Sequence, residues 1–157
     1  MKKTLVAYFS CTGNTKKMAQ AIADALDCRL YEIKPAQPYT QADLDWTNKG
    51  SRSSIEMADK NSRPQIVKGL KNASEYQTIF LGFPIWWYTA PTICNSFLES
   101  YDFSNVCIIP FATSGGSNFG QTGQSLQASV PKAQIEAGKV LRSTTEATRW
   151  AKEMANK

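Results

Sequence analysis

The sequence predicts an α/β protein with a single domain, built on a doubly wound, five-stranded parallel sheet with helices on both faces. Apolar runs of strand length alternate along the chain with segments whose apolar residues recur at helical spacing. Two of these runs, 78–83 and 106–112, are almost wholly apolar, as expected for central strands that are covered on both faces. A length of 157 residues fits one domain with a substantial core, so the domain is expected to span 1–157.

The first strand is expected at residues 4–9, and a helix begins soon after it. The strand has the length and the β-branched and aromatic content of a buried strand. Within the helix, apolar side chains recur on one face, at Met18, Ala21, Ile22, Ala25 and Leu26. A second strand is expected at 29–34.

A helix joins the third strand, at 78–83, to the fourth, at 106–112, and Pro91 suits its first position. The inward face of this helix is predicted to consist of Ile93, Cys94, Phe97, Leu98 and Tyr101. A fifth strand is expected near 138–141, and the last helix then opens with a capping box at 143–146. The last helix is predicted to bury Ala147, Trp150, Ala151 and Met154.

A long connection, residues 35–64, departs from this simple alternation. Loops beyond about 15 residues usually have a function or contain structure of their own. Residues 38–46 could form a short capped helix, whereas 48–63 is polar and carries four Lys or Arg residues. Two interpretations remain open: a solvated insertion, which we favour, and a lid near the ligand edge of the sheet.

A polar turn follows the first strand and precedes the first helix. It consists of Ser10, Cys11, Thr12, Gly13, Asn14 and Thr15. Unpaired N–H groups at a helix start, with the helix dipole behind them, form an anion site. The turn lacks the Lys of a nucleoside-triphosphate loop and the three glycines of a dinucleotide loop. Its neutral donors suit a terminal phosphate monoester, although an ordinary N-capped helix would have a similar sequence.

The pattern Ser10-x-Thr12-Gly13-x-Thr15 resembles the phosphate loop of the flavodoxin family. Two later segments, 82–91 and 110–120, resemble flavin-facing loops and follow in the expected order, so the resemblance covers nearly the whole chain. It implies a flavodoxin-like fold with FMN as the cofactor. Beyond the turn, it implies cofactor binding by Pro84, Ile85, Trp86, Trp87, Tyr88, Thr113, Ser114, Gly115, Gly116 and Phe119.

The chemistry of the isoalloxazine ring fits the composition of these two loops. The ring is large, flat and mostly apolar, so stacked aromatic side chains would supply area and orientation. Adjacent residues leaving a strand point in different directions, so we expect Trp86 or Trp87 to stack on the ring rather than both to be buried. Residues 113–116 permit close backbone approach to its polar pyrimidine side, unless they form a mere turn.

Two functions of the family remain open. The short chain and the phosphate turn are similar to electron-carrier flavodoxins, which implies transfer between a reductase and acceptor proteins without catalytic residues in this chain. Residues 84–87 contain a Pro and no Gly, where carriers often have a flexible glycine, and are similar to the ring-facing loop of NAD(P)H:quinone reductases. The net charge of +5 also departs from the acidic carriers. We favour the carrier, with an FMN-dependent NAD(P)H:quinone-type oxidoreductase as the alternative.

Composition excludes several other classes. The chain has no His, which rules out a His-based triad or general base. Lys and Arg are scattered rather than gathered in a stripe, so nucleic acid is not an expected partner. No apolar stretch has membrane-spanning length, and the four Cys residues lack metal-type spacing. With no signal-peptide pattern at the N-terminus, we expect a cytoplasmic monomer with free thiols and no metal.

Overall fold

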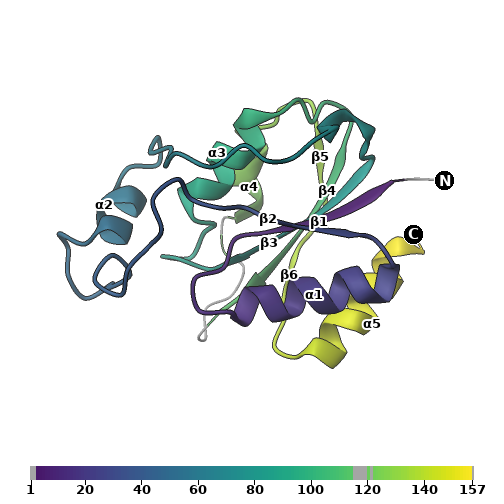
Figure 1. Cartoon of the computed structure of the whole chain (residues 1–157), viewed down its shortest axis with the longest axis horizontal. Helices are drawn as coiled ribbons and strands as arrows, with labels where there is room; N and C mark the ends of the chain where they lie inside the picture. Colours follow the sequence, from purple (N-terminus) through teal and green to yellow (C-terminus); the bar gives the residue numbers. More distant parts are fainter. Residues whose placement is uncertain (1–2, 115–119, 121, 157) are drawn as a thin grey trace.

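The computed structural model describes residues 3–114, 120 and 122–156 (Figure 1). In chain order its elements are β1 (Thr4–Tyr8), α1 (Asn14–Leu26), β2 (Arg29–Glu32), α2 (Arg52–Ala58), the 3-10 helix η1 (Ala73–Glu75), β3 (Thr78–Pro84), α3 (Thr92–Ser100), β4 (Cys107–Thr113), α4 (Thr122–Gln127), β5 (Gln134–Ile135), β6 (Lys139–Val140) and α5 (Thr144–Ala155). The predicted order of strands and helices is confirmed, with boundaries that differ by one or two residues for most elements.

The strands form a parallel sheet in the order β2-β1-β3-β4-β5. The chain moves outward from β1 to β2 and then returns past β1 to start β3, so the direction of winding reverses beside β1. Ligands of doubly wound sheets bind at such a reversal, outside the carboxyl ends of the strands. The predicted fold class is therefore confirmed, and it places the candidate site at the ends of β1, β3 and β4.

The predicted fifth strand at 138–141 is confirmed as β6, and a further short strand that the sequence does not predict, β5, pairs with the same edge of β4. β5 pairs with Cys107 and Ile108, whereas β6 pairs with Phe111 and Ala112. Between these two contacts lies Pro110. The carbonyls of Ile108 and Ala112 accept hydrogen bonds from this edge, so by strand alternation the N–H position of residue 110 faces it as well. Proline has no N–H to donate, which explains why the ladder is interrupted there.

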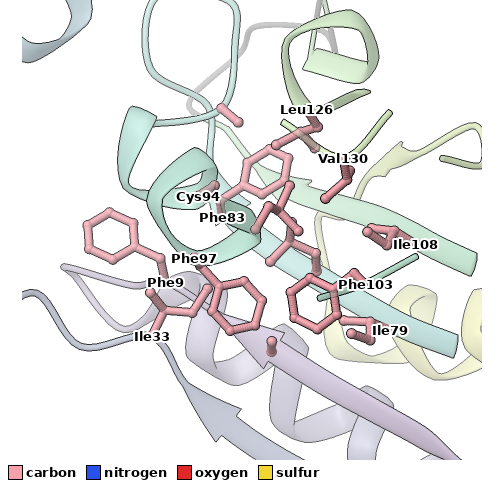
Figure 2. Close-up of a cluster of buried hydrophobic side chains, with 14 of the residues drawn as sticks. Phe9, Ile33, Ile79, Phe83, Cys94, Phe97, Phe103, Ile108, Leu126 and Val130 are labelled. Atoms are coloured by element: carbon pink, nitrogen blue, oxygen red, sulfur yellow. The ribbon is translucent and has the colours of Figure 1, made fainter. Parts of the chain in front are cut away.

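Two helices cover each face of the sheet (Figure 1): α1 and α5 lie on one side, and α3 and α4 on the other. Under α3 and α4, the core is filled by large apolar side chains that include Phe9, Phe83 and Phe97 (Figure 2). On the opposite face, Trp150 of α5 packs edge-on against Phe80, with ring centroids 5.7 Å apart. In the described part of the chain, no helix has the length and apolar character needed to cross a membrane.

The predicted inward faces are confirmed for most residues of α3 and α5, where Met154 is half-buried, and for part of α1. Four of the five residues predicted for α3 are buried, and Tyr101 is half-buried just past its end. In α5, the Ser143 side chain accepts a hydrogen bond from the Glu146 N–H, as the predicted capping box requires. The buried face of α1 consists of Thr15, Met18, Ala19, Ile22 and Ala23. Met18 and Ile22 are among the residues predicted for this face, whereas the predicted Ala21, Ala25 and Leu26 are half-buried.

The long connection contains a helix, but not where the sequence predicts one. Residues 38–46 form turns, in which the N–H groups of Thr40 and Asp43 donate to each other's side chains. The helix is α2, which extends away from the sheet in Figure 1 and is capped by the side chain of Ser51. Ser51 and Ser53 are buried. Part of the connection is therefore packed, in contrast to the solvated insertion that we favour from the sequence alone.

Candidate functional site

Three loops meet at the carboxyl edge of the sheet, because β1, β3 and β4 are adjacent and parallel. The polar turn 10–15 follows β1, the segment 84–90 continues β3, and Ser114 follows β4. The hydroxyl oxygens of Thr15 and Thr113 lie 2.7 Å apart and share a hydrogen bond. This contact joins the last residue of the polar turn directly to the end of β4.

The polar turn ends in a helix start without a side-chain cap. Gly13 is the N-cap residue of α1, with φ 92°, and no side-chain hydrogen bond caps the helix there. The side chain of Ser10 instead accepts the N–H of Gly13 itself, at 3.1 Å. The alternative of an ordinary Ser- or Thr-capped helix is therefore wrong. The N–H groups and the dipole of α1 face the turn, where Thr12 and Asn14 are exposed and Thr15 is buried.

Cys11 lies in the same turn but remains an uncharged thiol. It keeps an exposed surface, yet desolvation by the surrounding protein raises the pKa of its thiol to about 11. Arg52 of α2 opposes this rise in pKa and Glu56 adds to it, so both charges act on the turn. The turn itself contains no Lys or Arg. The cation nearby is Arg52 of α2, which already forms an ion pair with Glu56.

Trp86 is packed in a cluster of aromatic side chains. Its ring meets Phe9 and Tyr39 edge-on, with centroids 5.7 Å and 5.6 Å away. Arg52 lies over the Tyr39 ring, 3.8 Å from its centroid, and donates to Glu56 at 2.9 Å. The hydroxyl of Tyr39 also donates to Glu56, at 2.5 Å. The long connection thus packs against Trp86, which is half-buried and enclosed on this side.

Trp87 and Tyr88 lie at the tip of a tight turn and are exposed. Two backbone hydrogen bonds between Trp86 and Thr89 close it, and Trp87 and Tyr88 both have positive φ, 48° and 64°. This is the geometry of a type I′ turn, which normally contains Asn and Gly. Large aromatic residues there cost about 1–3 kcal/mol each in backbone strain. Of the two candidate tryptophans, Trp87 is the one whose ring is free for stacking, with 47% of its surface exposed.

The base of this turn is fixed to the neighbouring loops. The N–H of Ile85 donates to the carbonyl of Thr113 at 2.9 Å, and Pro84 pairs with Thr113 in the sheet. Gly120 lies against the carbonyl of Tyr88, so closely that a Cβ there would be 2.2 Å from that oxygen. Thr113 and Ser114 are half-buried. The predicted site residues Gly115, Gly116 and Phe119 lie outside the described residues.

Sequence reasoning missed Tyr39, Arg52 and Glu56, which buttress Trp86. A signal for them exists in the chain: Ser51 suits an N-cap, and Arg52 and Glu56 are four residues apart, as in a helical ion pair. Because this segment has few apolar residues, its sequence does not indicate that it is packed. The packing is evident only in the structure, where Tyr39 contacts Phe9 and Arg52 lies over Tyr39.

Comparisons with known proteins give matches over nearly the whole chain. The family model described as Flavodoxin matches residues 3–156. A protein from Bacteroides uniformis, assigned as a flavoprotein, has 48% identity and a TM-score of 0.91, over 96% of this chain and 98% of its own. A similar protein from Bacteroides eggerthii has 43% identity and a TM-score of 0.91, over 100% of both chains. A flavoprotein from Lactobacillus acidophilus, solved in complex with FMN, has 26% identity and a TM-score of 0.74, over 96% and 99%. No curated protein matches the chain.

Proposed function

The chain belongs to the flavodoxin family, and from this premise we propose that it binds FMN and carries electrons between a reductase and acceptor proteins. FMN is the cofactor that the family and the FMN complex of the Lactobacillus acidophilus relative support. The observation that carries the proposal is the meeting of three loops around an open helix start, joined by the Thr15–Thr113 hydrogen bond. Bound FMN would supply the redox chemistry, while the chain binds and orients it.

The residues at this edge fit the two ends of FMN. Its phosphate would accept hydrogen bonds from Ser10, Thr12 and Asn14 and from the backbone N–H groups at the start of α1. Ser10 can donate its hydroxyl proton because its bond with Gly13 uses only a lone pair. The isoalloxazine ring would stack on Trp87, with Tyr88 beside it, and its pyrimidine edge would face the loop that begins at Thr113.

The two tryptophans are expected to respond differently to truncation. Trp87→Ala should weaken FMN binding by roughly 0.5–1.5 kcal/mol beyond the lost contact area, because it removes a stacked ring. Trp86→Ala should mainly lower the melting temperature, because this ring packs against Phe9 and Tyr39. Flavin titration and thermal unfolding of both variants test this, and the reverse pattern would assign stacking to Trp86.

A reductase remains the second candidate because of the backbone near Pro84. The N–H of Ile85 is bonded to Thr113, and Pro84 is paired within the sheet, so the start of the ring loop is held. A carrier of this family often has a flexible glycine in this loop, as noted above. The fixed start of this loop is therefore the observation that supports an FMN-dependent NAD(P)H:quinone-type oxidoreductase as the second candidate.

Steady-state kinetics distinguish the two functions. For the carrier, we expect negligible oxidation of NADH or NADPH by the FMN-loaded protein with a quinone present, and rapid turnover once a flavoprotein reductase is added. Turnover of about 10 per second without the reductase, a typical enzyme rate, would assign the reductase function instead. The proposal includes a cytoplasmic monomer, and the four cysteines, all free thiols, support that compartment.

A further inference from the structure

A cavity of about 470 Å³ lies at the amino edge of the sheet, opposite the edge that holds the proposed cofactor site. Its walls come from the end of α5 and from the first residues of four strands, Thr4 of β1, Thr78 of β3, Cys107 of β4 and Gln134 of β5. In Figure 1, β1 begins and α5 ends on this side of the molecule, away from α2. No described residue of 10–15, 84–90 or 113–120 lines the cavity, so it is separate from the cofactor site.

The strand register places the four strand residues side by side. Thr4 pairs with Thr78, Thr78 with Cys107, and Cys107 with Gln134. Paired residues of neighbouring strands have their side chains on the same face, and the strands lie about 4.8 Å apart, so the row spans roughly 14 Å. The cavity is therefore elongated across the strands, and its volume falls within the range of about 300–1,000 Å³ that is usual for small-ligand pockets.

The floor of this cavity is closed, whereas its walls are accessible. Phe80 and Ile109, two residues further along β3 and β4, are buried and close the floor. Thr78, Cys107 and Met154 are half-buried, so each keeps surface that a ligand can contact. A ligand would thus have the sheet on one side and the thioether of α5 on the other.

A single carboxylate gives the cavity its charge. Glu136 lines it, and no other charged side chain does so among the described residues. Its Oε1 accepts from the amide of Gln134 at 2.6 Å and from the thiol of Cys107 at 3.7 Å, which leaves Oε2 to accept from a ligand. Glu136 is half-buried and forms no ion pair within the described chain, whereas the ammonium of Lys3, at the same edge, is bonded to Glu75. A cationic ligand would supply the missing charge.

We propose that this cavity binds a small aromatic amine. The ammonium group donates to Glu136, and the ring lies along the row of strand residues, over Cys107 and Thr78, where Met154 covers it. A ring on a short alkyl chain suits this shape because the carboxylate is at one end of the row and small side chains line the rest. Contacts between a thioether and an aromatic ring are favourable. This inference goes beyond the proposed electron transfer, because the cavity is at the other edge of the sheet and requires no flavin.

Calorimetric titration with 2-phenylethylamine and with its neutral analogue 2-phenylethanol tests the proposal, on the protein as purified and after saturation with FMN. We expect the amine to bind about tenfold more tightly than the alcohol in both preparations, because only the amine forms a charge-assisted hydrogen bond with Glu136. Amide chemical shifts of the isotopically labelled protein locate the probe. The largest changes are expected in 78–80, 107–109 and 134–136.

Two variants separate the charge of the site from the contact with the ring. Glu136→Gln should weaken binding of the amine about tenfold and leave binding of the alcohol nearly unchanged. The matched change Glu153→Gln removes the same charge from the end of α5, outside the cavity, and should leave both affinities unchanged. Met154→Ala should weaken the amine and the alcohol alike, by severalfold, because it removes the side chain that covers the ring.

Equal binding of the amine and the alcohol would overturn the proposal, as would equal effects of Glu136→Gln and Glu153→Gln. Binding that does not saturate at millimolar amine would also overturn it, and so would chemical-shift changes centred on 10–15 or 84–90, which would place the probe in the cofactor site. Failure of the protein to bind FMN would contradict the proposed function but not this cavity, because titration of the purified protein does not depend on the flavin.

Discussion

Replacement of Thr12 by Ala is expected to weaken FMN binding roughly tenfold to hundredfold, and to change riboflavin binding far less. Thr12 is exposed at the turn before α1, where no side chain caps the helix. A hydrogen bond to a charged group typically contributes about 1.5–3 kcal/mol, and riboflavin lacks the phosphate that would accept it. Titration of the flavin-free protein with each ligand, followed by flavin fluorescence, measures both affinities.

A matched variant separates the hydroxyl from the rest of the side chain. Thr12→Ser keeps the donor and should retain most of the FMN affinity, whereas Thr12→Val keeps the shape and should behave like the Ala variant. If Thr12→Ala weakens FMN and riboflavin equally, the phosphate is bound elsewhere. That result would remove the polar turn from the cofactor site even though the fold is unchanged.

Gly120→Ala is expected to weaken flavin binding by at least tenfold, because it separates two loops that touch through their backbones. A Cβ at residue 120 would lie 2.2 Å from the carbonyl oxygen of Tyr88, and the φ of 59° there favours glycine. Moving the carbonyl of Tyr88, which belongs to the strained 86–89 turn, would cost free energy. We therefore expect the exposed rings of Trp87 and Tyr88 to shift. Flavin affinity and the quenching of tryptophan fluorescence by bound flavin measure this shift.

Gly123 provides the control for this substitution. It lies in α4, and a Cβ there would meet nothing within 4 Å. Gly123→Ala should leave flavin affinity unchanged and raise stability by up to about 1 kcal/mol, because Ala is the better helix former. Equal loss of flavin affinity in both variants would show that the contact between Gly120 and Tyr88 does not organise the site.

Local patterns were sufficient to predict the fold and the order of the loops. Apolar runs at 78–83 and 106–112 identify strands that are covered on both faces, whatever their partners are. The turn 10–15 is likewise recognisable, because its hydroxyls and its glycine are close together in the chain. Even here the cap was ambiguous, since only the structure distinguishes the Ser10 contact with Gly13 from an ordinary side-chain cap.

Features that depend on contacts between distant segments required the tertiary structure. Trp86 and Trp87 are equivalent in the sequence, and they differ because Phe9 and Tyr39 pack against the first, whereas the second lies at the tip of a tight turn. The break between β5 and β6 depends on the side of β4 that Pro110 faces. The sequence by itself therefore determines the strands, helices and turns, because these arise from the periodicity of neighbouring residues. Which side chains are buried or exposed at the site is decided by packing between segments that the chain separates widely.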